Sequence, residues 1–144
     1  MKASIEQTEL LKAMAKVQSI VERRTTIPIL SNVLIEAKDS SLYLRTTDLD
    51  IEVLDKVEAI IETPGSLTVG ANTLYEIVRK LPDGSRVEFL NDIGSSQLEI
   101  VASRSKFFLS TLPKEDFPIM ATEEYDFELS LKSKVIKRLF DKSK

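Results

Sequence analysis

Apolar residues along this chain follow two different periods, and the change from one period to the other recurs three times. Each copy has a short alternating stretch and then apolar residues three and four positions apart, which indicates a strand leading into a helix. The copies are Ser4-Ile5 with Leu10, Ala13 and Met14; Thr68-Val69 with Leu74, Ile77 and Val78; and Ser130-Leu131 with Ile136, Leu139 and Phe140. Such a near-constant period is typical of structural units that stack on one another. Because the third copy is interrupted at Lys144, we expect the chain to stop within a longer array.

The first two copies each predict one strand, one helix and three further strands. In the first copy the predicted elements are a strand at 1–6, a helix from Thr8 with apolar residues to Val21, and strands at 33–37, 42–46 and 51–62. In the second copy they are a strand at 67–69, a helix from Ala71 or Asn72 to Leu81, and strands at 86–90, 97–102 and 106–111. Residues 112–124 indicate a linker, and a strand at 126–131 with a helix at 133–140 opens the third copy.

The predicted fold class is α+β, with two pseudo-symmetric strand-helix-three-strand units. Short turns such as Lys38-Asp39-Ser40-Ser41 connect the strands, so the sheet is expected to be antiparallel. The helices place their apolar stripes on one face of that sheet and leave their polar faces outward on the same side. Residues 1–120 then form the first domain, and residues 121–144 form a linker and the start of a second domain.

Composition excludes several kinds of site. The chain has no cysteine and no histidine, so disulfides, cysteine- or histidine-ligated zinc and Ser-His-Asp triads cannot form within it. It has no glycine pattern typical of a phosphate-binding loop. No apolar run approaches 18 residues and the N-terminus has no signal-peptide h-region, so we expect a cytoplasmic protein with no membrane partner.

Charge is separated along the chain, although the net charge is only −3. Residues 1–24, 71–80 and 129–144, which hold the predicted helices, carry net charges of +2, +1 and +5. The remaining stretches, 25–70 and 81–128, carry −5 and −6. An acidic protein can therefore present one positive surface, and a positive surface is what a polyanion such as DNA meets.

Besides binding to a polyanion, two classes of function fit parts of the sequence. Asp48 and Asp50 form an Asp-x-Asp pair before a predicted strand, and such a pair can hold Mg²⁺ in a carboxylate-based enzyme. The alternative role for Asp48 is to fix the turn through the backbone. A small protein-binding α+β module without any DNA role is the other hypothesis.

A set of short motifs spread along the whole chain resembles one known family. The motifs are Leu10-Leu11-Lys12, Arg24, Ile27-Pro28-Ile29-Leu30-Ser31-Asn32, Thr47-Asp48-Leu49-Asp50, Leu81-Pro82-Asp83-Gly84, Ser110-Thr111-Leu112-Pro113 and Asp116-Phe117-Pro118. In this order and spacing they resemble the β sliding clamp of bacterial DNA polymerase III. The resemblance implies the DNA-clamp fold and a non-catalytic protein without cofactor or metal. It also implies that this chain is the first of three similar domains in a subunit that closes head to tail with a second subunit into a ring around duplex DNA.

The resemblance also implies a set of DNA-contacting residues. In the family, helices line the hole of the ring, and the basic helices found from the charge count would form that lining. Arg24 matches a loop position at which clamps contact phosphates, and Arg23 lies beside it. The other expected contacts are Lys12, Lys16, Arg79, Lys80, Lys134 and Arg138. Lys137 lies on the same predicted helix as the last two, and the alternative for that helix is a frayed, solvated C-terminal tail. Asn72 and Thr73 are uncharged where family members are often basic.

The resemblance further implies a subunit edge and absent partner sites. Residues 104–110 match the edge strand that pairs with the neighbouring subunit, with Phe107 and Leu109 packing across the join and Arg104 and Lys106 meeting acidic groups. The alternative is an ordinary edge strand guarded by its charges. In the family, DNA polymerase and the clamp loader bind a peptide pocket between domains two and three, which this chain lacks.

Overall fold

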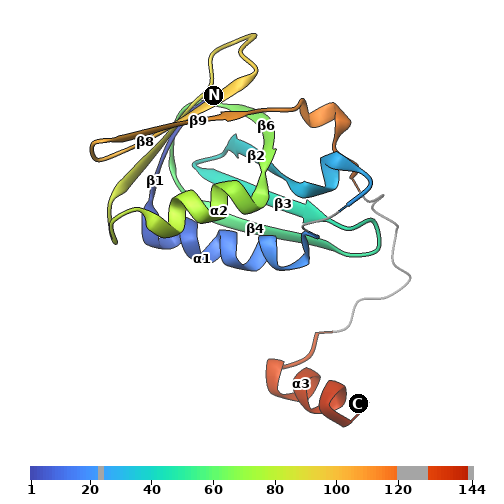
Figure 1. The fold of residues 1–144 in the computed structure, drawn as a ribbon. Helices are drawn as coiled ribbons and strands as arrows, with labels where there is room; N and C mark the ends of the chain where they lie inside the picture. Colours follow the sequence, from blue (N-terminus) through green and yellow to red (C-terminus); the bar gives the residue numbers. More distant parts are fainter. Residues whose placement is uncertain (23–24, 120–129, 143–144) are drawn as a thin grey trace.

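Two antiparallel sheets and two helices form the repeated part of the chain, and a third helix lies near the C-terminus (Figure 1). The computed structural model describes residues 1–22, 25–119 and 130–142. Its strands are β1 (Lys2–Glu6), β2 (Asn32–Lys38), β3 (Ser41–Thr47), β4 (Glu52–Glu58), β5 (Ile60–Thr63), β6 (Gly65–Gly70), β7 (Arg86–Leu90), β8 (Gln97–Ala102) and β9 (Ser105–Ser110). Its helices are α1 (Gln7–Val17), α2 (Ala71–Lys80) and α3 (Ser133–Lys142), with 3₁₀ turns η1 (Gln18–Ile20), η2 (Pro28–Ser31) and η3 (Lys114–Asp116).

Helix α1 follows β1 without an intervening loop. It begins at Gln7, one residue before the predicted start, and the backbone N–H of Gln7 donates to the carbonyl of Ser85 at 2.8 Å. Its buried side chains are those of Gln7, Leu10, Ala13, Met14 and Val17. The helix passes into η1 after Val17, so Val21, which the periodicity assigned to the helical face, lies beyond it. Helix α2 repeats this pattern and buries Ala71, Leu74 and Val78.

Each sheet combines strands from both repeats, which we call unit one (residues 1–64) and unit two (residues 65–119). The strand orders are β5-β1-β7-β8-β9 and β4-β3-β2-β6. Strand β1 pairs with β7 of unit two, and β6 pairs with β2 of unit one. The first strand of each unit is therefore exchanged into the sheet of the other. The predicted α+β class, antiparallel pairing and twofold pseudo-symmetry are confirmed.

The prediction of one strand over residues 51–62 is wrong. The run divides at Ala59, whose backbone N–H donates to Ser40, and its two halves lie in different sheets as β4 and β5. Alternation continues across the break because each half keeps one face toward the interior. Strand β5 pairs with β1, and the Lys2 ammonium lies 2.8 Å from the Glu62 carboxylate. The hydrogen bond with Glu62, together with its charge, raises the pKa of Lys2.

The prediction of a linker from residue 112 onward is wrong for its first part. Leu112 and Thr68 exchange two backbone hydrogen bonds of 3.0 Å, η3 packs against β6, and Phe117 is only 4% exposed. Leu112 pairs with β6, the first strand of unit two, just as β5 pairs with β1, the first strand of unit one. The segment at Leu112 therefore follows the same pseudo-symmetry as β5. Residues 120–129, which include most of the strand predicted at 126–131, lie outside the described residues.

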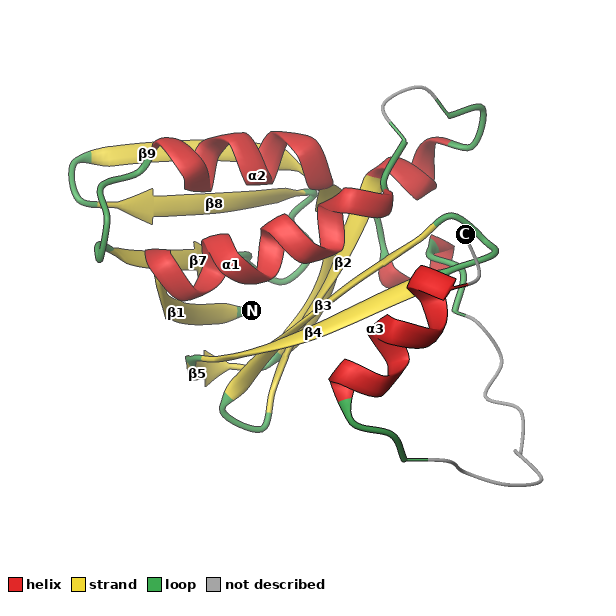
Figure 2. Ribbon diagram, turned by 90° about the horizontal axis from the view of Figure 1, so that it is seen from below, coloured by secondary structure: helices red, strands yellow, loops and turns green. Residues whose placement is uncertain are grey.

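The core lies between the two helices and the inner faces of both sheets, and α1 and α2 cover the same side (Figure 2). Its largest fully buried side chains include Ile5, Leu10, Met14, Leu44, Leu74, Phe89 and Ile100. Each such side chain contributes about 1.5–3 kcal/mol on burial. The two units share this core, so neither has a hydrophobic interior of its own. Within the described residues, no helix combines the length and the apolar composition needed to cross a membrane.

Candidate nucleic-acid interface

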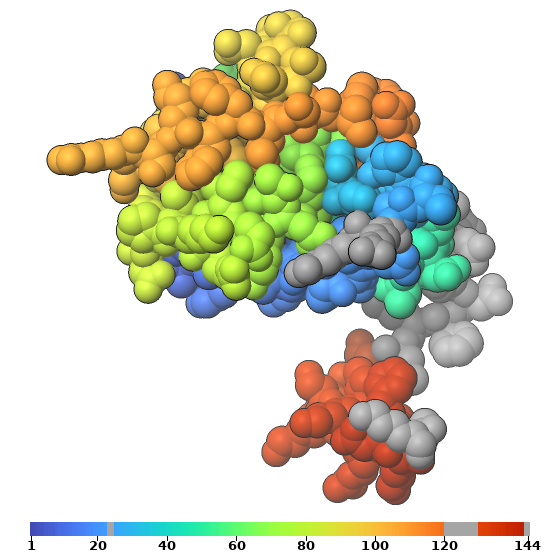
Figure 3. All heavy atoms as spheres, in the orientation of Figure 1, coloured from blue at the N-terminus to red at the C-terminus, as the bar shows by residue number. Residues whose placement is uncertain are grey.

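Helices α1 and α2 pack against each other and present their outer sides as one face, blue and yellow-green in Figure 3. A buried hydrogen bond joins them, because Nε2 of Gln7 donates to the carbonyl of Val78 at 2.9 Å. The amide of Gln7 is almost completely buried, so this bond is shielded from competing water. The relative position of the two outer helix faces is therefore set by core packing and by one interior polar contact.

The predicted cations of α1 and α2 all reach solvent on this face, but they differ in their neighbours. The Lys12 ammonium lies 3.4 Å from the Glu9 carboxylate, and Lys16 lies 3.4 Å from Asp55 of β4. The Arg79 guanidinium lies 2.6 Å from Glu76. Lys80 has no ion pair within the part of the chain that the structure describes.

These exposed pairs hold their cations weakly. Exposed ion pairs contribute about 0–1 kcal/mol and weaken with salt. Each lysine or arginine can therefore leave its carboxylate for a phosphate at small expense. Helices α1 and α2 each keep a net charge of +1, as the charge count of their residues indicates. The face is mildly positive and its charges are separated, which suits contact with a phosphate backbone rather than reading of base edges.

The remaining predicted DNA contacts are not among the described residues of α1 and α2. Arg23 and Arg24 lie outside the described residues. Lys134, Lys137 and Arg138 lie on α3, where all described side chains are exposed. Asn72 and Thr73, predicted as uncharged positions of the inner surface, line a groove beside α2.

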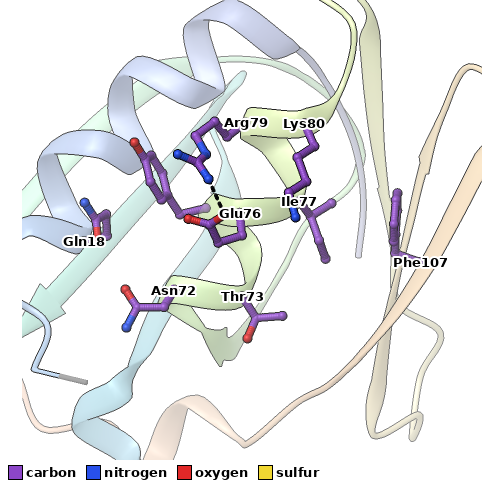
Figure 4. Close-up of a pocket in the computed structure, with 9 residues that line it drawn as sticks. Gln18, Asn72, Thr73, Glu76, Ile77, Arg79, Lys80 and Phe107 are labelled. Carbon is purple, nitrogen blue, oxygen red and sulfur yellow. Dashed lines mark hydrogen bonds and ion pairs between the residues drawn. The ribbon is translucent and has the colours of Figure 1, made fainter. Parts of the chain in front are cut away.

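The groove between α2 and β9 has a volume of about 770 Å³ (Figure 4). Its lining residues are Gln18, Asn72, Thr73, Tyr75, Glu76, Ile77, Arg79, Lys80 and Phe107. Ile77 and Phe107, from α2 and β9, supply its apolar walls. The apolar spacing of α2 places Ile77 on one face with Leu74 and Val78, and Ile77 does pack against the core, half-buried at the border of the groove. Nothing in the sequence alone gives the separation of α2 from β9, which creates the groove.

Strand β9 is the last strand of its sheet. Phe107 and Leu109 are half-buried and pack against the core, whereas Phe108 between them is exposed. Arg104, predicted on the edge strand, lies in the turn between β8 and β9. The Lys106 ammonium lies 3.0 Å from Glu99 on the neighbouring strand, so its charge already has a partner within the chain.

The Asp-x-Asp pair is part of a turn. One carboxylate oxygen of Asp48 accepts hydrogen bonds from the backbone N–H groups of Asp50 at 2.9 Å and Ile51 at 2.7 Å, around Leu49 at φ 80°. The prediction that Asp48 fixes a turn is confirmed. Among the described residues, no group of three or more His, Cys, Asp or Glu could hold a metal ion. The turn geometry thus gives no support to a carboxylate-based magnesium site.

Comparison with known proteins identifies a single family over most of the chain. A family model described as the DNA polymerase III beta subunit, N-terminal domain, matches residues 1–121. A beta sliding clamp from Caulobacter vibrioides is 46% identical over 144 residues, which is 100% of this chain and 39% of that protein. A beta sliding clamp from Vibrio harveyi is 34% identical over 145 residues and is covered over 98% of its length.

Solved structures agree with these sequence relatives. The Caulobacter crescentus pol III beta structure superposes with a TM-score of 0.94 at 47% identity, over 99% of this chain and 38% of that one. The DNA polymerase III subunit beta from Pseudomonas aeruginosa gives a TM-score of 0.92 at 35% identity, over 98% of this chain and 38% of that one. The chain thus spans less than two fifths of the length of these full subunits.

Proposed function

Because this chain belongs to the DNA polymerase III beta-subunit family, whose N-terminal domain it matches, we propose that it forms the first domain of a DNA sliding clamp. The full subunit closes with a second copy, head to tail, into a ring around duplex DNA. The ring keeps the replicative polymerase on its template and does no chemistry itself. DNA polymerase and the clamp loader bind through regions outside this chain, and no cofactor is used. The subunit works in the bacterial cytoplasm.

The observation that carries this proposal is the shared outer face of α1 and α2. Lys12, Lys16, Arg79 and Lys80 lie on it at separate points, and three of the four have a weak carboxylate partner. Contacts to phosphate are alike at every base pair, so they do not fix the protein at one sequence. Weak, exchangeable pairs therefore favour a protein that holds DNA without stopping on it. Arg24, with Arg23 beside it in the sequence, adds a phosphate contact, and Lys134, Lys137 and Arg138 add charge from α3.

The edge strand β9 supports the ring. Phe107 and Leu109 lean toward the core beside the open α2–β9 groove, and among the described residues no strand pairs with the outer edge of β9. A strand added there gains main-chain hydrogen bonds and fills apolar pockets on alternate residues. We assign this edge, with Arg104 and Lys106 at its start, to the contact with the second subunit.

A protein-binding module without a DNA role is the second candidate, because the α2–β9 groove could accept a different partner. Topology separates the two. The full-length subunit is loaded by its clamp loader onto nicked circular DNA, and the circle is then cut by a restriction enzyme. We expect retention on the circle and rapid loss from the linear product. Equal retention on both DNAs would contradict the ring, and no DNA association at low salt would favour the module.

A further inference from the structure

Phe108 is an exposed aromatic residue on an edge strand, and nothing in the proposed function so far explains it. Side chains alternate across a strand, so Phe107 and Leu109 lean toward the helices and Phe108 points to the outer face of the sheet. Its side chain remains 58% exposed. Single exposed apolar residues are common on protein surfaces, so exposure alone does not indicate a contact.

The second observation is that β9 is apolar on both faces at once. Phe107, Phe108 and Leu109 are consecutive, and the pairing of β8 with β9 runs in regular register from Gln97 to Ala102. Edge strands that must stay unpaired are usually interrupted by a bulge, a proline or charges. Here Lys106 is the only charge in the strand, and Glu99 already pairs with it. An open edge strand with a large exposed apolar side chain and a single, already paired charge is a feature expected where another chain covers it.

The equivalent edge of unit one, β4, has charged residues at two of these three positions, although its Leu54 is also 50% exposed. Side by side across one sheet lie Asp55 of β4, Leu44 of β3, Ile35 of β2 and Leu67 of β6. Side by side across the other sheet lie Phe107 of β9, Ile100 of β8, Phe89 of β7 and Ala3 of β1. Because Leu67 and Ala3 occupy the same place in the repeat, Asp55 and Phe107 are equivalent, and so are Lys56 and Phe108. The fold therefore accepts a lysine where β9 has Phe108, and at these two positions unit two has apolar side chains in place of charged ones.

The immediate surroundings leave one side of Phe108 open. In the sheet, Phe108 lies beside Glu99, and Glu99 lies beside Leu90. These three line a shallow outer groove of about 380 Å³ together with Asp92, Ser95 and Gln97. On its other flank β9 has no neighbouring strand within the described part of the chain. Among the residues that the structure describes, only Leu90 adds an apolar side chain to this groove, and a strand beyond the edge would add further apolar cover for Phe108.

We propose that Phe108 forms a second, outward-facing contact of the subunit interface, against an apolar side chain on the outer face of the partner's edge strand. The inference rests on the proposed pairing of β9 with a second subunit. A strand paired with β9 carries side chains on both faces, and directly opposed Cβ atoms lie about 4.5–5.5 Å apart. Phe107 and Leu109 then join the two subunits on the helix side of the sheet, and Phe108 joins them on the outer side.

The test compares serine variants of the full-length subunit by sedimentation velocity or subunit exchange. Phe108→Ser is expected to raise the dimer Kd about tenfold, and Phe108→Leu to raise it less than about threefold. Ile93→Ser is the matched control, because Ile93 is fully exposed at the β7–β8 turn and lies off the β9 edge. It is expected to leave the Kd unchanged. The Tm of each first domain should not change, since Phe108 contributes little to the core.

Phe107→Ser separates failure of this inference from failure of the proposed function. If Phe107→Ser weakens the dimer and Phe108→Ser matches the Ile93→Ser control, the outer contact is wrong while the β9 interface stands. If neither β9 variant changes the Kd, the β9 interface itself is wrong, and the outer contact fails with it. An effect of Phe108→Ser on some other partner, with the dimer Kd unchanged, would also overturn the proposal.

Discussion

Units one and two use the same frame but treat the gap between helix and edge strand in opposite ways. In unit one, Lys16 of α1 reaches Asp55 of β4, and the groove there has a volume of about 300 Å³ with mostly charged walls. In unit two, Lys80 is equivalent to Lys16 and Phe107 is equivalent to Asp55. Because Phe107 is uncharged, no ion pair can form there, and the groove has a volume of about 770 Å³. The repeat therefore fixes the backbone and leaves the chemistry of each edge to a few side chains.

The difference teaches how one fold provides both a closed and an open edge. A buried or half-buried charge needs a partner, and Asp55 finds one within its own unit. An apolar residue such as Phe107 instead gains by leaving water, and the neighbouring helix of its own unit does not cover it fully. Four predictions follow the comparison, each of which exchanges or removes one of the features that distinguish the units.

The largest effect is expected from giving unit two the side chain of unit one. Phe107→Asp places a carboxylate near Lys80, as Asp55 lies near Lys16, and removes the apolar wall of the groove. We expect the dimer Kd of the full-length subunit to rise about a hundredfold or more, because a charge would be buried in the interface. Sedimentation equilibrium measures it. Phe107→Leu serves as the control and should stay within about tenfold of the unchanged protein; a dimer unaffected by Phe107→Asp would contradict the assignment of this edge.

The next effect concerns the helix pair. Gln7 and Ala71 are equivalent in the repeat, so Gln7→Ala gives unit one the small residue that unit two already has. The change removes the buried hydrogen bond to Val78 and leaves a cavity, which should lower the free energy of unfolding by about 2 kcal/mol. Urea denaturation measures it on the first domain. Gln97→Ala, at an exposed residue, should change stability by less than about 0.5 kcal/mol, and an equal effect of both changes would show that the Gln7 amide contributes nothing special.

A smaller effect is expected for DNA association. Lys80 lacks an ion pair among the described residues, whereas its equivalent Lys16 must first leave Asp55 before it meets a phosphate. Lys80→Ala should therefore weaken DNA association about threefold at low salt, which is more than Lys16→Ala. It should also lower the slope of log affinity against log salt concentration by about one. Fluorescence anisotropy with duplex DNA and the full-length subunit gives both numbers. Equal losses for the two lysines would mean that the Asp55 pair has no influence on DNA.

The smallest effect is the coupling between Lys16 and Asp55 itself. A double-mutant cycle of Lys16→Ala and Asp55→Ala should give an interaction energy of about 0.5 kcal/mol, because Lys16 is mostly exposed. Chemical denaturation at low and high salt measures it, and the coupling should shrink as salt is added. A coupling above about 2 kcal/mol would contradict this expectation and show that the Lys16–Asp55 pair contributes substantially to stability.

Much of this molecule follows from its sequence, and the repeat explains why. Alternation and three-to-four spacing depend on which side of an element is buried, so they predict α2 and most strands to within one or two residues. The apolar spacing of α1, by contrast, continues to Val21, four residues beyond its end at Val17. The charges of Lys12, Lys16, Arg79 and Lys80 lie on the outer helix face because their neighbours at helical spacing fill the core. Asp48 was assigned its turn from its residue type alone, and the turn is there.

What the sequence could not give depends on contacts between distant residues. Periodicity shows that residues 51–62 keep one buried face, but not that the chain leaves one sheet for the other at Ala59. Phe117 follows Asp116 in a segment rich in turn residues, so nothing local indicated that it returns to the domain. The α2–β9 groove is lined by side chains that are 30 residues apart in the sequence, such as Ile77 and Phe107. Helix and strand periodicity relate only residues a few positions apart, so they cannot predict this groove.

The exchange of β1 and β6 between the sheets has a consequence for ancestry. Two copies of a single unit, not yet fused, could build both sheets only by trading their first strands, as domain-swapped dimers do. A gene duplication that joined them at Pro64, between β5 and β6, would make that trade permanent and let each copy mutate separately. The half-domains would then have been free to diverge at their edges, one toward charge and one toward phenylalanine, while neither could leave the other.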